Sequence, residues 1–391
     1  MLKKISSLSL LPLLLLLTVL MSCSSQKEEK VIHNKIALKP DGRLPLIKTV
    51  RVDDGNIDFY LHESNGKDRL AVVLHPEDHT RKVVLFNKEL EQTGSFTLPS
   101  GKGPGELGSW IPGMGMDGHL ITFIDRQKNS MEMFAYDGRF EDSVPIQDAS
   151  YSLSFGNCVV THFGENYYIG MTYPGSVVKT DAQFNAIGRI SQETELDVQK
   201  MFENLVRYTV DPSGNVYAVM LGLKGSYEIR KYDSGMNLVK TAYNDDGLND
   251  LLSLEICRFP DGSFEANGGA SATSLCVKGG KLYVLRGVAG INDVKWEDGK
   301  KVYYGLPIPG LKKGFVDIFD TGTLKHLARV DAEFLEPHQD YRLYPFDDRF
   351  VFVATSEIDK ETGKEKETSD YIYTTGLEPL EEIPALQGKA R

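Results

Sequence analysis

The chain has 391 residues, of which 41% are hydrophobic and 25% are charged, a composition typical of a folded protein. Its formal net charge is −11, from 44 basic and 55 acidic residues. Because nucleic-acid binding relies on Lys and Arg to neutralise phosphates, this acidic balance argues against nucleic acid as a partner. It also argues against electrostatic attachment to an anionic lipid surface.

The N-terminus has the pattern of an export signal. Lys3 and Lys4 precede an apolar run from Leu8 to Met21, which is shorter than the roughly 20 residues of a membrane-spanning helix. This pattern predicts a signal peptide over residues 1–22. The sequence Leu20-Met21-Ser22-Cys23 resembles the lipobox of bacterial lipoproteins. The resemblance implies acylation of Cys23, a membrane partner held through the lipid anchor, and an outer-membrane lipoprotein facing the periplasm or the cell surface.

Residues 23–45 are polar and contain Pro40, Gly42 and Pro45, which predicts a lipidated flexible tether. Within this segment, Gln26-Lys27-Glu28-Glu29 resembles the short acidic signal that sends some Gram-negative lipoproteins to the cell surface. A solvated charged linker is the alternative interpretation.

From residue 46 onward a unit recurs in place of helical periodicity. Each copy has a turn rich in Gly and Asp, a short strand of β-branched and aromatic residues, and a second strand that ends near Asp, Asn or Gly. The spacing predicts an all-β fold, a six-bladed β-propeller of four-stranded antiparallel blades over residues 46–391. An irregular β-sandwich or two smaller domains are the alternatives. The expected strand pairs are 70–74 with 83–87, 120–124 with 131–136, 167–171 with 177–178, 216–220 with 227–232, 282–285 with 315–319, and 350–353 with 371–373.

The second copy carries a family resemblance. It contains Gly103-Pro104-Gly105-Glu106, then Ile111-Pro112-Gly113, and ends in Phe134 to Phe140 around Asp137-Gly138. This order resembles an NHL repeat, with Leu107 where an aromatic residue is usual. Together with the other copies, over about residues 46–391, this order resembles the NHL-like or TolB-like six-bladed propeller lipoproteins of Gram-negative envelopes. The resemblance implies a fold and says little about function. The glycines before Glu106 are expected to form a crossover between blades, because the Lys-Ser/Thr of a phosphate loop is missing.

Three further cysteines, Cys158, Cys257 and Cys276, permit either one disulfide with a free thiol or three buried thiols, and the buried thiols are favoured. Cys257–Cys276 is the one pair to test as a disulfide. No metal site and no cofactor are predicted. His75 and His79 flank Pro76, which breaks the helical spacing of a zinc pair. The acidic loop 244–250 lacks the ligand set of an EF-hand, which leaves an irregular calcium site as an open alternative.

Two insertions, residues 241–272 and 286–313, interrupt the repeat. The second one places Trp296, Tyr303 and Tyr304 on a predicted long hairpin, where they could bind a ligand or stack on sugar rings. Packing of Trp296 on its own hairpin or on a neighbouring blade is the alternative. Trp110 is a further candidate ligand-binding residue near a channel mouth, with core packing as its alternative.

The sequence identifies no catalytic residue, and it has no G-x-S-x-G nucleophile motif. We therefore expect a lipid-anchored binding or scaffold protein for a glycan, a peptide or a partner outer-membrane protein. The architectural subunit of an uptake complex belongs to the same class. The alternative is a propeller hydrolase or lyase whose carboxylates converge on the central channel, since 55 acidic residues offer many candidate pairs.

Overall fold

The computed structural model describes residues 30–52, 56–65, 67–75, 80–146, 158–171, 176–191, 206–221, 226–245, 254–270, 273–291, 294–303, 311–335, 338–346, 348–357 and 370–376, with residues 380, 383 and 386. Nearly all regular structure in these ranges is β-strand, accompanied by the 3-10 turn η2 (Glu333–Leu335). The prediction of an all-β chain is confirmed. No helix among the described residues is long and apolar enough to cross a bilayer.

The first part of the chain forms three groups of four consecutive antiparallel strands. Parallel pairing of the first strands of the second and third groups joins these two groups into one eight-stranded sheet. The strands are β4 (Asn56–Ser64), β5 (Arg69–His75), β6 (Arg81–Asn87) and β7 (Gln92–Leu98); β8 (Gly113–Met116), β9 (Leu120–Asp125), β10 (Ser130–Ala135) and β11 (Phe140–Pro145); and β12 (Cys158–Phe163), β13 (Asn166–Met171), β14 (Ser176–Thr180) and β15 (Ala186–Ser191).

Three more antiparallel groups follow, each completed at its outer edge by a strand from the N-terminal segment. The first is β16 (Val206–Val210), β17 (Val216–Leu221), β18 (Ser226–Tyr232) and β19 (Leu238–Asp245), with β1 (Lys30–Lys35) beside β19. The second is β22 (Thr273–Lys278), β23 (Lys281–Ile291), β26 (Leu311–Asp320) and β27 (His326–Asp331), with β2 (Gly42–Arg43) beside β27. The third is β28 (His338–Pro345), β29 (Arg349–Glu357) and β30 (Tyr371–Gly376), with β3 (Leu46–Arg51) beside β30.

The strand pairs expected from the repeat match these groups. Each pair forms the second and third strands of one group, for example β5 with β6 and β17 with β18. These are the central strands, and their residues are buried on both faces, as in the run Leu70 to Leu74 at 0–1% exposure. Burial on both faces produces the continuous apolar runs that made these strands recognisable in the sequence.

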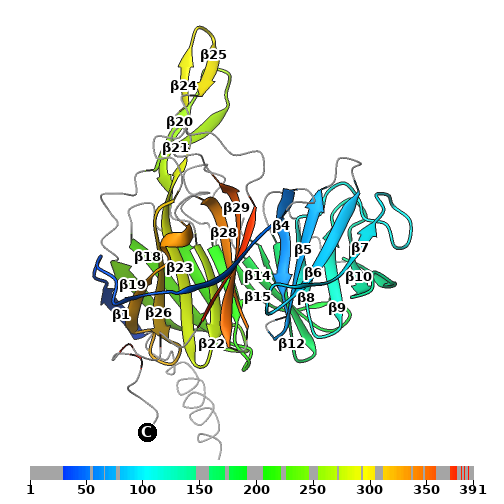
Figure 1. Cartoon of the computed structure of the whole chain (residues 1–391), viewed down its shortest axis with the longest axis horizontal. Helices are drawn as coiled ribbons and strands as arrows, with labels where there is room; N and C mark the ends of the chain where they lie inside the picture. The colour runs from blue at the N-terminus through cyan, green and yellow to red at the C-terminus, as the bar shows by residue number, and fades with distance from the viewer. Residues whose placement is uncertain are drawn as a thin grey trace, which may run out of the picture.

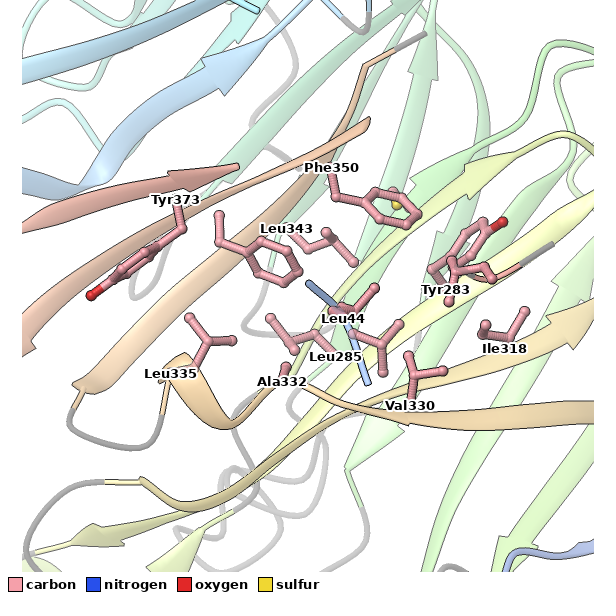
Figure 2. Packing of buried hydrophobic residues seen from close by; sticks show 14 of the residues in the cluster. Leu44, Tyr283, Leu285, Ile318, Val330, Ala332, Leu335, Leu343, Phe350 and Tyr373 are labelled. Atoms are coloured by element: carbon pink, nitrogen blue, oxygen red, sulfur yellow. The ribbon is translucent and has the colours of Figure 1, made fainter. Parts of the chain in front are cut away.

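The buried apolar side chains of the described residues form six clusters, and each cluster lies between two neighbouring groups. Figure 2 shows the largest, in which Leu285 of β23 faces Leu343 of β28 and Phe350 of β29. The first strands of the groups also contact one another in a closed order, β4 with β8, β12, β16, β22, β28 and back to β4. The groups therefore pack face to face around a ring.

The ring is completed by pairing between the two ends of the described chain. Strand β3 is antiparallel to β30, with Thr49 opposite Tyr373 and Arg51 opposite Tyr371. This sheet therefore joins β3 and β30, which are more than 300 residues apart in the sequence.

The tether prediction is wrong for residues 30–45. Strand β1 pairs in parallel with β19, and β2 pairs in parallel with β27. Ile36 and Leu44 are buried, at 3% and 1% exposure, in two of the clusters between sheets. Burial of these two apolar side chains fixes a segment whose Pro, Gly and charge content suggested a linker. Residues 1–29, including the predicted signal peptide and Cys23, lie outside the described residues.

Side-chain hydrogen bonds close most of the tight turns. In the turns that begin at Asp181, Asp211 and Asp233, the carboxylate accepts backbone N–H groups two and four residues ahead. The fourth residue of such a turn has positive φ, as in Phe184 (60°), whose ring is nevertheless buried at 4% exposure. In the Asp181 turn the carboxylate thus holds the backbone while the apolar side chain of Phe184 returns to the core.

Candidate functional site

The two ends of the strands have different connections. Connections between the first and second strands and between the third and fourth strands span only two to five residues, and we call this side the turn end. Connections between the second and third strands, and from one group to the next, lie on the opposite side, the loop end. All the longer connections are at the loop end, including residues 99–112 between β7 and β8. Loops on a rigid scaffold commonly carry function, so the loop end is the candidate binding face.

The two insertions form one projecting structure at the loop end, which we call the arm (Figure 1). It consists of β20 (Leu254–Arg258), β21 (Phe264–Ala270), the hairpin β24 (Val294–Glu297) and β25 (Lys300–Tyr303), and the outer part of β23. Strand β21 pairs with β23 beyond the region where β23 pairs with β22, with Gly268 opposite Ile291. The outer part of β23 thus continues the sheet of the body into the arm.

Trp296 packs against a ring from the other insertion. Its indole stacks on Phe259, with ring centroids 5.8 Å apart and an interplanar angle of 26°. The Lys301 ammonium lies 5.4 Å from the centre of the same Phe259 ring. Trp296 thus packs on the other insertion, a partner that is neither its own hairpin nor a neighbouring blade. The Tyr303 backbone pairs with Val294, whereas the Tyr303 side chain and all of Tyr304 lie outside the described residues.

Trp110 lies on the surface of the loop end, at 48% exposure, so the core-packing alternative is wrong for this residue. The backbone on either side of the indole is fixed: the Gly108 N–H donates to the Asp125 carboxylate at 2.6 Å, and the Arg126 N–H donates to the Trp110 carbonyl at 3.0 Å. The Arg126 guanidinium lies 5.9 Å from the indole centre, within the range of a cation–π contact. Trp110 is thus an exposed aromatic side chain on a well-held loop.

The glycine-rich segment before Trp110 forms the crossover that its sequence predicts. The Glu106 carboxylate accepts the Gly103 N–H at 2.7 Å. The Lys128 ammonium donates to the carbonyls of both residues and forms an ion pair of 2.7 Å with the buried Glu132. Glu106 and Lys128 therefore hold the crossover from within.

A second group of polar side chains lies on the innermost strands, away from the arm. On β28, the Tyr344 hydroxyl donates to the His62 carbonyl of β4 at 2.7 Å and lies 2.8 Å from its Nδ1. Burial raises the pKa of the adjacent Glu63 to about 7, an effect that the Ser64 N–H and the positive charge of Arg342 oppose. Arg342 and Arg207, from β28 and β16, both act electrostatically on Tyr344, whose pKa burial raises well above its usual value.

This channel cluster, defined by His62, Glu63, Tyr344, Arg342 and Arg207, draws on three of the innermost strands. None of these five residues was predicted from the sequence as a site residue. The sequence signal for this cluster is the pair His62-Glu63 near the end of the strand over 56–64. From the sequence alone a buried His-Glu pair cannot be told from an exposed one, because its burial depends on how the strands close into a ring.

The cysteines do not form the tested disulfide. The sulfurs of Cys257 and Cys276 are not joined to each other. Cys276 is buried in the cluster between the β22 and β28 sheets, and burial raises the pKa of its thiol far above the usual range. This agrees with the interpretation of Cys276 as an apolar filler. The Cys158 side chain lies outside the described residues.

The metal candidates receive no support from the described residues. Among those, no group of three or more His, Cys, Asp or Glu side chains could hold a metal ion. In the acidic loop considered for calcium, the Asn244 amide bonds to Asn34 and to the Tyr227 carbonyl, so it serves the contact between β1 and β19. The rest of that loop, apart from Asp245, lies outside the described residues, as do His79 and the side chain of His75.

Comparison with known proteins gives distant structural similarity only. No protein-family model matches the chain, and no curated protein matches it. A Bacteroides fragilis protein named as a candidate exported protein has 13% identity and a TM-score of 0.47, over 88% of this chain and 99% of that one. A member of the duf4221 family from Bacteroides vulgatus has 10% identity and a TM-score of 0.43 (86% and 98%), and the RRP9 WD40 repeats have 11% and 0.42 (84% and 97%). At such similarity the function of a neighbour does not transfer.

Proposed function

We propose that the chain is a six-bladed β-propeller lipoprotein that binds a partner protein of the outer membrane through its loop end. Three observations support the propeller: the groups of four antiparallel strands, the core clusters between successive groups, and the closed order of contacts among the first strands. A propeller leaves only short strand edges, which suits a chain with this much strand. The pairing of β3 with β30 is the closure such a ring requires.

Export and lipid anchoring rest on the N-terminal sequence, where Cys23 follows a short apolar run. One acyl chain binds a membrane only marginally, whereas two or three give stable attachment. We expect wild type to partition with the outer membrane and the Cys23→Ala variant to be released from it. Equal membrane retention of the two proteins contradicts the anchor.

The observation that carries the binding function is that the arm and the exposed Trp110 emerge from the same end of the strands. Trp and Arg are enriched at the energetic centres of protein interfaces, and Trp110 lies beside Arg126. A glycan bound on a plane of Trp296, Tyr303 and Tyr304 has less support, because Phe259 covers one face of the indole. A protein partner is therefore favoured over a glycan or a free peptide.

The test begins with co-purification of the lipidated full-length protein with its partner from native envelopes. Binding of the identified, purified partner is then measured for wild type, for Trp110→Ala and for a variant whose residues 294–303 are replaced by a two-residue turn. We expect each change to weaken binding at least tenfold, about 1.4 kcal/mol, with an unchanged melting temperature. Equal affinity of all three proteins for the partner contradicts the proposal. If the protein binds a glycan on an array and no protein partner co-purifies, the function is glycan binding instead.

The channel cluster favours a second candidate function, a hydrolase or lyase. A carboxyl group with a pKa near 7 suits a general acid or base, and Glu63 has such a pKa beside Arg342. The catalytic arrangement expected from the sequence requires a second carboxylate converging on the channel. The test measures hydrolysis or elimination of a panel of glycosides and polysaccharides. Activity of wild type that is lost in Glu63→Gln supports an enzyme. No turnover by wild type contradicts the enzyme and favours the binding function.

A further inference from the structure

We propose that the turn end faces the membrane and that the loop end, with the arm, points away from it. This orientation rests on the proposed anchoring at Cys23 and deepens it, because it identifies which surface meets lipid and which meets the partner. Three features of the molecule set this orientation: the position of β1, the length of chain between Cys23 and β1, and the length of the arm.

Strand β1 begins close to the turn end. Its first residue, Lys30, lies opposite Lys240 of β19, only three residues beyond the turn that ends at Asn237. The Lys240 ammonium donates to the carbonyl of Gly322, which belongs to a tight turn of the neighbouring sheet. Lys30 is therefore level with two turns of the turn end, at the outer edge of the ring.

The connection to the anchor is short. Seven residue steps separate Cys23 from Lys30, so the connecting chain reaches at most about 25 Å when fully extended. The connection between Cys23 and the body is this short because residues 30–35 pair with β19. A free tether from residue 23 to residue 45 would reach about three times as far. The start of β1 is consequently held within about 25 Å of the lipid surface.

The arm is longer than this connection. Strand β23 runs 11 residues from Lys281, next to the turn at Gly279 and Gly280, and β24 adds four residues before the tip at Asp298. At about 3.3 Å per residue, the tip stands about 50 Å from the turn end. If the arm touched the bilayer with the loop end downward, Lys30, about 10 Å inside the turn end, would be about 40 Å from the lipid surface, well beyond the 25 Å reach of the connection. The inverted orientation is thus excluded by covalent length.

The chemistry of the turn end is mixed. Its turns carry Asp, Asn, Lys and Gly, including Asp181, Asp233 and Glu165, and exposed apolar side chains lie on the strands beside them, at Leu46, Ile47, Ile187 and Leu238. The proposed anchor holds this surface near lipid, and the loop end remains free to meet a partner.

The test measures energy transfer to a headgroup-labelled acceptor lipid in phosphatidylcholine vesicles that carry the lipidated protein. A donor dye is placed, through an azido amino acid, at the exposed Glu165 of the turn end or at the exposed Asp298 of the arm tip. We expect strong transfer from position 165 and several-fold weaker transfer from position 298. Insertion of twenty Gly/Ser residues before Lys30 should reduce this difference, because the longer connection permits other orientations.

The controls separate the orientation from the anchoring. Cys23→Ala should abolish transfer from both positions. Equal transfer from both positions in anchored wild type, or stronger transfer from position 298, overturns the orientation and leaves the anchor intact. Absence of transfer from both positions in wild type overturns the anchor and the orientation together.

Discussion

The buried ion pair between Asp317 and Arg329 provides a sharp test of how the sheets are held together. The Arg329 guanidinium donates to both carboxylate oxygens, at 2.6 and 2.8 Å, and the two side chains are 0% and 1% exposed. The Tyr227 hydroxyl, from the neighbouring sheet, donates to the same carboxylate at 2.9 Å, so Asp317 links β26 to β18. Asp317→Asn removes the negative charge and leaves Arg329 buried without its partner.

The expected loss is large because an uncompensated buried charge is costly. Breaking one member of such a pair lowers the free energy of unfolding by about 3–5 kcal/mol, which corresponds to a fall in melting temperature of about 4–7 °C for a chain of this size. The matched control is Asp348→Asn. Arg349 donates to both Asp348 oxygens, at 2.8 and 3.0 Å, but Asp348 is 48% exposed. There we expect a loss of about 1 kcal/mol or less.

The assay is thermal unfolding of the three proteins by circular dichroism between pH 3 and pH 8. Burial alone would raise the pKa of Asp317, but the hydrogen bonds and the charge of Arg329, with His326 Nε2 3.6 Å away, outweigh burial and hold that pKa below its usual range. The stabilisation is therefore complete above the unfolded pKa of about 4 and is lost as the pH falls below it, so the gap between wild type and Asp317→Asn should narrow at pH 3. Equal losses for Asp317→Asn and Asp348→Asn at pH 7 would refute the reasoning.

Three other predictions concern packing and titration. A Cβ on Gly115 would lie 2.1 Å from the Val160 carbonyl oxygen of β12, so Gly115→Ala should lower the free energy of unfolding by about 1–3 kcal/mol in chemical denaturation, whereas Gly118→Ala, with open space around it, should change it little. The raised pKa of Glu63 means that stability falls as the pH rises from about 4.5 to 7, so Glu63→Gln should flatten the melting temperature over that window; an unchanged slope contradicts this. The Cys276 thiol should resist a maleimide in the native protein and react on unfolding, as read by mass spectrometry.

The sequence predicted the central strands well because their signal is local. Runs such as Val83 to Phe86 are apolar at every position, and tight turns carry their own Asp and Gly residues. The outer strands were harder to recognise. In β1, Val31, His33 and Lys35 face solvent, and only partnership with β19, more than 200 residues away, makes the segment a strand. A non-local pairing of this kind leaves no periodicity that identifies its partner.

For the candidate site too, the sequence predicted local features and missed those that depend on contacts between distant segments. The projecting hairpin around Trp296 was predictable from a turn sequence inside an insertion, but its stacking on Phe259 was not, because two separate insertions meet there. For Trp110 the sequence left a channel mouth and the core as alternatives, and its exposure became known only with the loop whose backbone is held at Gly108 and Arg126. Glu63 was missed, since the features that raise its pKa, burial and a nearby Arg342, come from closure of the ring.

The most direct test of the account is photo-crosslinking in native envelopes, with a benzophenone amino acid placed at Asp298 of the arm tip or at Glu165 of the turn end. We predict that position 298 crosslinks to an outer-membrane protein, and that this product disappears when Trp110 is replaced by Ala. Position 165 should give no such protein product and should crosslink to lipid. The same protein partner captured from position 165, with lipid captured from position 298, would contradict the account.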